Sequence, residues 1–175
     1  MPDRLPIFVN PEHAATRGFR TSGLLRLGSM ERLTDRLADP FGKVEVELEF
    51  GKHGNRMFIH GTVQGHAVLQ CQRCLERFEL PIDTQIKLGL IHSEAEIESL
   101  LPEEEPLLLD ESNRDELCLA DVVEDELELI LPMVARHSEG LCQSGIAPVK
   151  EEIKPQELKS TKKNPFAVLA DLKKR

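Results

Sequence analysis

Apolar and polar residues alternate along much of the first half of the chain, which is the pattern of a half-buried β-strand. The alternation is clearest in residues 44–50, and it resumes in residues 57–63 after the turn residues 52–55. A third short stretch covers residues 66–70, and a long fourth one, apolar at every second position, covers residues 78–90. Connections this short leave no room for crossover helices, so the pattern predicts antiparallel strands that begin with a β-hairpin.

Two stretches have a helical pattern instead. Residues 29–37 place apolar side chains on one face, with Ser29 as the expected N-cap, and residues 119–131 do the same up to Pro132, which ends the helix. Shorter extended segments are expected at residues 4–9 and 106–109. Together these elements predict an α+β fold, in which an antiparallel sheet, either open or closed toward a barrel, packs with a few helices.

The end of the chain has a different composition. Residues 150–163 are rich in Lys, Glu, Ser, Thr and Pro without periodicity, as in a flexible linker. In residues 164–175, Asn at the N-cap, Pro at the first helical position and a basic last turn predict a short helix. So short a helix is marginal alone, so we expect it to dock on the body or on a partner. The predicted organisation is therefore one domain over residues 1–149, the linker, and a C-terminal helical motif.

Charge is distributed unevenly. The chain of 175 residues has a net charge of −9, yet residues 94–128 alone contain fifteen acids and one base, Arg114. Residues 150–175 contain eight bases and four acids. Such asymmetry fits either partner surfaces or a solvated acidic face. No apolar run is long enough to span a bilayer and no signal peptide is evident, so we expect a soluble, cytoplasmic protein without membrane contact. Trp and Tyr are absent, which disfavours a base-stacking platform.

The cysteines suggest a metal site. Cys71 and Cys74 form a Cys-x-x-Cys turn between two predicted strands, which is half of a tetrahedral zinc site. His137 and Cys142 could supply the other half. The alternative, which the sequence leaves open, is that the thiols are reduced and bind no cofactor. Redox chemistry of the thioredoxin type is disfavoured, because strand rather than helix follows the turn. Cys118 is expected to be a small packed residue.

Acidic side chains form a second cluster. Asp121, Glu124, Asp125 and Glu128 share the polar face of the predicted helix over residues 119–131. Paired carboxylates could bind a divalent cation or act as acid and base. Neither a nucleophile nor a phosphate-binding or metalloprotease motif accompanies them, so we interpret them as a solvent-facing or partner-facing stripe. We predict no catalytic residues and no small-molecule substrate.

Three stretches resemble those of one known family. They are the cysteine pair with its internal Arg in residues 69–74, the acidic helix ending in Leu-Pro in residues 122–132, and the closing Asn-Pro-Phe-Ala-Val-Leu segment in residues 164–173. The last, following a Lys-rich linker, is the most specific. Their order and spacing also fit, so the resemblance to the large ribosomal RNA subunit accumulation protein (YceD) family covers nearly the whole chain.

The resemblance implies a role in the synthesis, processing or stability of large-subunit (23S) ribosomal RNA, with no known enzymatic activity. It also implies a second cysteine pair after the Leu-Pro helix, where this chain keeps only Cys142 and His137 is the candidate substitute. The alternative function is a zinc- or thiol-dependent regulatory module that acts on ribosomal RNA levels indirectly. A metal-dependent nuclease that uses the acidic helix is a third, disfavoured hypothesis.

Two kinds of partner are expected. A precursor of the large-subunit RNA would meet basic regions, which are Arg17, Arg20, Arg26, Arg73, Arg77 and residues 162–175, because acids repel phosphates. A basic ribosomal protein would instead meet the acidic segment. The predicted partner-binding residues are Arg73, Arg77, Glu124, Asp125, Glu128, Asn164, Pro165, Phe166, Leu169 and Lys173.

Overall fold

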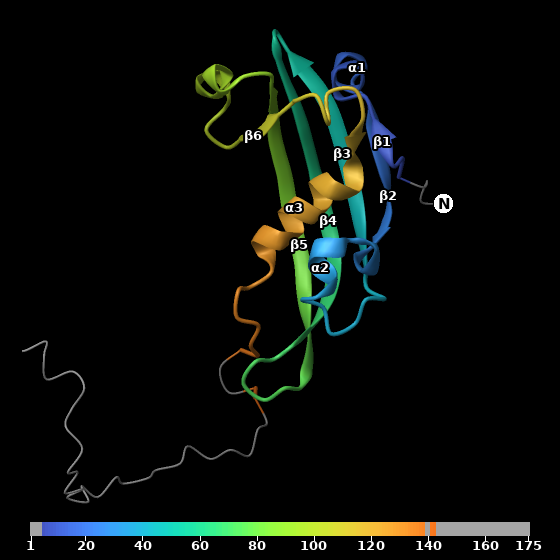
Figure 1. The fold of residues 1–175 in the computed structure, drawn as a ribbon, viewed down its shortest axis with the longest axis vertical. Helices are drawn as coiled ribbons and strands as arrows, with labels where there is room; N and C mark the ends of the chain where they lie inside the picture. The colour runs from blue at the N-terminus through green and yellow to red at the C-terminus, as the bar shows by residue number, and fades with distance from the viewer. Residues whose placement is uncertain (1–4, 139–140, 143–175) are drawn as a thin grey trace, which may run out of the picture. The chain divides into compact units, whose positions relative to one another are not determined.

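The computed structural model describes residues 5–138 and 141–142, which belong to one compact unit (Figure 1). Within these residues, five strands form the main sheet in the order β2-β3-β4-β5-β6, and a separate two-stranded ribbon pairs β1 with β7. The elements are, in chain order, β1 Phe8–Val9, α1 Pro11–Arg17, β2 Arg20–Arg26, the 3-10 helix η1 Leu27–Ser29, α2 Glu31–Thr34, β3 Lys43–His53, β4 Arg56–Gln70, β5 Arg77–Ile91, the 3-10 helix η2 Glu94–Ser99, β6 Glu105–Leu108, β7 Leu117–Cys118 and α3 Leu119–Ile130.

The predicted hairpin is confirmed, and its second strand is longer than expected. β3 and β4 pair antiparallel around Gly54, whose φ of 63° a glycine adopts readily. The separate strand predicted at residues 66–70 is the continuation of β4. Residues 66–70 continue β4 without a break because β4 pairs with β5 along nearly all of its length, from Met57 opposite Leu90 to Gln70 opposite Arg77. The long strand predicted at residues 78–90 is β5.

The last strand of the sheet runs in a direction that the spacing did not predict. β6 pairs with β5 in parallel, with Leu88 opposite Glu105. This is possible because the chain crosses back through η2 before β6 begins. Within the described residues β2 and β6 are the free edges, so the sheet is open and mixed rather than a closed barrel. The α+β class is confirmed.

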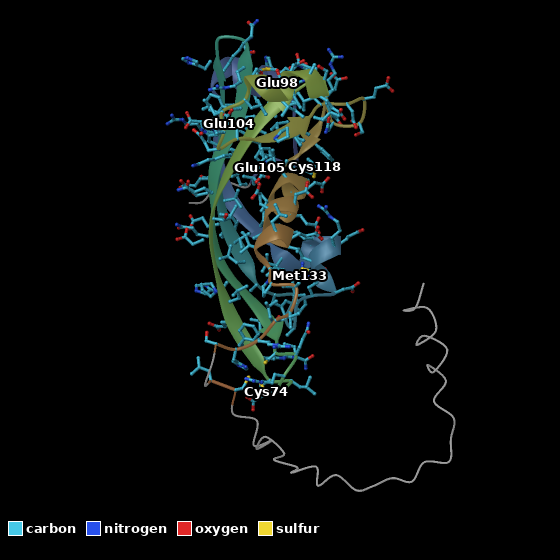
Figure 2. All side chains as sticks on the ribbon, turned by 90° about the vertical axis from the view of Figure 1, so that its left-hand side faces the viewer. Cys74, Glu98, Glu104, Glu105, Cys118 and Met133 are labelled. Atoms are coloured by element: carbon cyan, nitrogen blue, oxygen red, sulfur yellow. The ribbon has the colours of Figure 1, made fainter. Side chains whose placement is uncertain are left out.

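One face of the sheet is buried under α3, which lies across the strands in Figure 1. The apolar positions of β3, β4 and β5 point toward this face, and the core that they form with α3 includes Val46, Phe50, Ile59, Val63, Ile86, Val122, Val123 and Leu127. Each such side chain contributes about 1.5–3 kcal/mol by leaving water. Viewed edge-on, the sheet carries α3 on one side and polar side chains on the other (Figure 2). As predicted, α3 ends just before Pro132.

The elements that the sequence analysis missed include α1 and β2, although local signals for α1 are present. Asn10 caps α1 by accepting a hydrogen bond from the amide of His13 at 2.8 Å, Pro11 follows, and Gly18 with φ 63° ends the helix. These are the same start signals that predicted a helix at residues 164–175. With only seven residues, α1 has no extended apolar period to detect. The next strand, β2, carries mostly exposed side chains, because it lies at a sheet edge.

The helix predicted at residues 29–37 is much shorter, and its N-cap was wrong. It spans Glu31–Thr34, with Met30 at the N-cap position. The hydroxyl of Ser29 instead donates to the carbonyl of Arg26 at 2.7 Å, which closes the preceding 3-10 turn. Of the described part of the segment predicted at residues 4–9, residues 5–9, only Phe8 and Val9 form a strand.

None of the helices in the described residues is long and apolar enough to cross a membrane. The predicted linker over residues 150–163 and the C-terminal motif over residues 164–175 lie outside the described residues, as do residues 143–149 of the predicted domain. These boundaries therefore stay predictions.

Candidate metal centre

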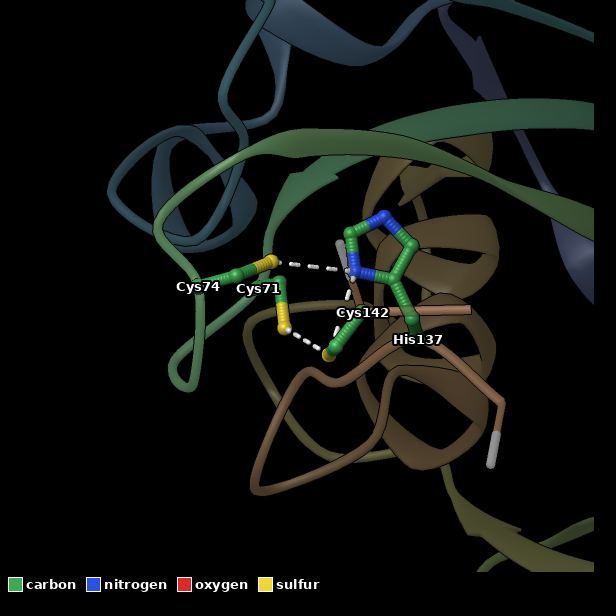
Figure 3. A group of neighbouring side chains, drawn as sticks. All are labelled: Cys71, Cys74, His137 and Cys142. Atoms are coloured by element: carbon green, nitrogen blue, oxygen red, sulfur yellow. Dashed lines mark hydrogen bonds between the residues drawn. The ribbon is translucent and has the colours of Figure 1, made fainter. Parts of the chain in front are cut away.

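The Cys-x-x-Cys segment forms the tight connection between β4 and β5. The amide of Cys71 donates to the carbonyl of Glu76 at 2.9 Å, and the amide of Leu75 donates to the carbonyl of Cys71 at 2.8 Å. Leu75 adopts a φ of 62°, which is uncommon for a residue with a branched side chain. This turn directs Cys71 and Cys74 toward the same side (Figure 3).

The segment after α3 brings the other two residues to this turn. Pro132 ends the helix, and the carbonyl of Ala135 then accepts a hydrogen bond from the amide of Gln72 at 2.8 Å. Two residues later, the ring of His137 packs at 4.9 Å from the ring of Phe78, measured between centroids. The end of α3 at Pro132 therefore sets the position of His137, and the chain comes back to the same place at Cys142, five residues later.

The four side chains predicted as metal ligands meet at one point (Figure 3). The sulfur of Cys74 lies 3.3 Å from Nδ1 of His137, and the sulfur of Cys71 lies 3.6 Å from that of Cys142. The sulfur of Cys142 lies 3.7 Å from the same Nδ1, and all four ligand atoms lie within 4.8 Å of one another. Cys118 lies far from them, at the start of α3 (Figure 2).

The surroundings shift the pKa values of the two thiols of the turn in opposite directions. Burial raises the pKa of Cys71, but hydrogen bonds from backbone amides, those of Cys74, His137 and Arg73, outweigh it and lower this pKa to about 5. A hydrogen bond from the backbone amide of Glu76 lowers the pKa of Cys74, but burial and the neighbouring sulfurs of Cys71 and Cys142 outweigh it. The pKa of Cys74 is therefore raised overall. A thiolate is thus stabilised at Cys71, and a thiolate is the form of cysteine that binds metals.

The acidic stripe of α3 is only partly exposed. Glu124 is buried, and its Oε1 accepts hydrogen bonds from the amides of Arg32 at 2.7 Å and Leu33 at 3.3 Å. The guanidinium of Arg32 also pairs with Asp125 at 2.5 Å and lies 3.9 Å from Glu128. Three of the four acids of the predicted stripe, Glu124, Asp125 and Glu128, therefore lie close to Arg32 of α2 within the protein. The fourth, Asp121, remains exposed.

A second buried carboxylate belongs to Glu104, a residue that the sequence did not single out. The side chain of Glu104 is fully buried and lies 3.4 Å from Nε of Arg56 and 3.3 Å from Nε2 of His60. Nothing in the sequence distinguishes it from the adjacent acids, since its burial follows from the fold of the loop between η2 and β6. Nearby, burial and then the charges of Glu105 and Asp125 raise the pKa of Glu126, as expected where acids crowd together.

The basic residues predicted to meet RNA have different surroundings. Arg20 pairs with Glu49 at 2.6 Å across the edge of the sheet. Arg73 lies within the cysteine turn and Arg77 begins β5; both are exposed and have no ion-pair partner within residues 5–138. The remaining predicted partner-binding residues lie outside the described residues, namely Asn164, Pro165, Phe166, Leu169 and Lys173.

Comparison with known proteins identifies the family. The family described as large ribosomal RNA subunit accumulation protein YceD matches residues 59–173. The large ribosomal RNA subunit accumulation protein YceD of Haemophilus influenzae is 31% identical over 173 residues, which cover 98% of each chain. No solved structure matches. A match that runs through the sheet, α3 and the cysteine turn shows that the chain belongs to the YceD family of large ribosomal RNA subunit accumulation proteins.

Proposed function

We propose that this protein supports the accumulation of large-subunit ribosomal RNA in the cytoplasm by binding the RNA precursor directly and without catalysing a reaction on it. The observation that carries the proposal is the family match over nearly the whole chain. The finer part, direct contact with RNA, rests on how the charged side chains are used in the described residues.

The acids are unsuited to phosphate contact, and several already bind basic side chains of the protein. Arg32 forms ion pairs with Glu124 and Asp125. Arg56 and His60 both lie within ion-pair distance of Glu104. The unpaired acids would repel an RNA backbone. A surface for RNA must therefore come from bases that are free of such partners.

Arg73 and Arg77 meet this requirement on the turn between β4 and β5. Both are exposed, and neither forms an ion pair within the part of the chain that the structure describes. The turn lies at one end of the sheet, marked by Cys74 in Figure 2, away from the acidic loop that carries Glu98. Separation from these acids lets phosphates approach the two guanidinium groups.

Binding can be tested by gel-shift titration of the full-length protein against large-subunit RNA fragments at several salt concentrations. We expect the double variant Arg73→Gln/Arg77→Gln to bind more weakly and to reduce the salt slope by about 1 for each phosphate that is no longer neutralised. The matched control is Lys52→Gln, because Lys52 is also exposed, was not predicted to meet RNA, and lies near the end of β3, at the other end of the sheet from the cysteine turn (Figure 1).

Two results would contradict the proposal. Wild-type affinity no higher than that of an unrelated acidic protein would exclude direct RNA binding and favour a basic ribosomal protein as the partner. Magnesium-dependent cleavage of the RNA fragments that disappears in Asp121→Asn would show catalysis. In cells, sedimentation profiles of a deletion strain should show less large-subunit RNA, and the arginine variant should fail to restore it.

A further inference from the structure

We infer that Cys71, Cys74, His137 and Cys142 together bind one Zn²⁺ ion, and that this ion fastens the segment after α3 to the turn between β4 and β5. The inference stands on the geometry of the four side chains and on the weak packing of that segment. It does not depend on whether the turn contacts RNA.

The spacing of the ligand atoms fits tetrahedral coordination. With Zn–S near 2.3 Å and Zn–N near 2.0–2.1 Å, two sulfurs on one zinc ion lie about 3.8 Å apart, and a sulfur and a nitrogen lie about 3.6 Å apart. The structure has 3.6 Å between the sulfurs of Cys71 and Cys142. It has 3.3 and 3.7 Å between Nδ1 of His137 and the sulfurs of Cys74 and Cys142. These three pairs fit within a few tenths of an ångström, and the remaining pairs, which lie no more than 4.8 Å apart, would have to close by at most about 1 Å for one ion to contact all four atoms.

The identity of the ligands selects the metal and the kind of site. Three thiolates and one imidazole prefer zinc over calcium or magnesium, which bind oxygen. Four protein ligands leave no position for water or substrate, so the site is structural rather than catalytic. The backbone amide of Arg73 points to the sulfur of Cys71 at 3.4 Å and would support its negative charge.

The segment that carries His137 and Cys142 has little else to hold it in place. Met133 is 94% exposed, and Val134 and Leu141 are 46% and 63% exposed. Within the described residues its other contacts are few: Ala135 is buried and its carbonyl accepts the hydrogen bond from Gln72, Arg36 donates to the carbonyl of Pro132 at 3.0 Å, and the ring of His137 packs on Phe78. So few contacts do not offset the conformational entropy that is lost when the loop becomes ordered. The binding free energy of a metal ion can offset that loss.

The cross-link joins parts of the chain that are far apart in sequence. Cys74 and His137 are 63 residues apart, and Cys71 and Cys142 are 71 residues apart. The metal thus closes the end of the sheet on the chain that leaves α3. It also holds the turn that presents Arg73 in a fixed conformation.

Metal content of the full-length protein, purified without chelator or an affinity tag that binds metals, tests the inference. We expect close to one zinc per chain by mass spectrometry of the metal. The variants Cys74→Ser and Cys142→Ser should each lose most of it. Cys118→Ser is the matched control, because Cys118 is a free cysteine outside the cluster, and it should keep one zinc.

Two further measurements keep the test decisive if a ligand variant unfolds. In the wild-type protein, three of the four thiols should react slowly with a thiol reagent until a strong chelator is added. Replacement of zinc by cobalt should give the visible absorption of tetrahedral thiolate coordination, changed in His137→Ala. Four equally reactive thiols and no metal in the wild type would overturn the inference, as would equal zinc content in Cys74→Ser, Cys142→Ser and Cys118→Ser.

Discussion

Replacing Glu124 tests whether a side chain of α3 caps the start of α2. The N-cap position of α2 is Met30, which has no side-chain oxygen to offer the free amides of the first turn. Oε1 of Glu124 accepts hydrogen bonds from two of those amides, those of Arg32 and Leu33, and Oε2 lies 3.3 Å from the guanidinium of Arg32. The cap thus comes from a residue 92 positions away from Arg32.

The cost of Glu124→Gln follows from these interactions. The amide oxygen of Gln can still accept from the backbone, but its NH₂ group would face the guanidinium, so the charge-assisted hydrogen bond is removed. Loss of a hydrogen bond to a charged group costs about 1.5–3 kcal/mol. Removing one member of a buried pair costs about 3–5 kcal/mol, but Arg32 is 46% exposed and keeps Asp125. We therefore expect the free energy of unfolding to fall by about 2 kcal/mol.

Urea unfolding followed by circular dichroism measures this change. With a slope of roughly 2 kcal/mol per molar urea, the midpoint should fall by about 1 M without a change in slope. The control is Asp121→Asn on the same helix, an exposed acid that should cost no more than about 0.5 kcal/mol. Equal midpoints for the two variants would refute the capping role of Glu124.

Two further changes test how tightly the sheet and its loop are packed. A Cβ at Gly61 would lie 2.3 Å from the carbonyl oxygen of Glu47, so Gly61→Ala should cost about 1–3 kcal/mol by urea unfolding. Gly54→Asn should stay within about 0.5 kcal/mol, since the turn is open and Asn tolerates positive φ; equal losses would contradict the steric argument. Glu104→Gln should cost about 3 kcal/mol, because it leaves Arg56 without its buried partner. The exposed Glu103→Gln serves as its control, and a thermal melt that does not separate the pair would disprove the ion-pair role.

The sequence by itself determined the elements whose patterns are long. The alternation in β3, β4 and β5 has a period of two over 11 to 15 residues, so it fixes which side chains enter the core whatever packs on them. The apolar face of α3 and its end before Pro132 were readable for the same reason. The cysteine pair could also be recognised locally, because two ligands in one turn need no information from the rest of the chain.

Only the tertiary structure decided features that depend on contacts between distant residues. The parallel direction of β6 depends on the path through η2, and the start of α2 depends on Glu124 from another helix. Glu124 and its neighbours look alike in sequence, since all lie on the polar face of one helix. Burial separates them, because α2 packs on one part of that face. Likewise, His137 and Cys142 complete the cluster only because the chain turns back at Pro132, and no local period encodes that return.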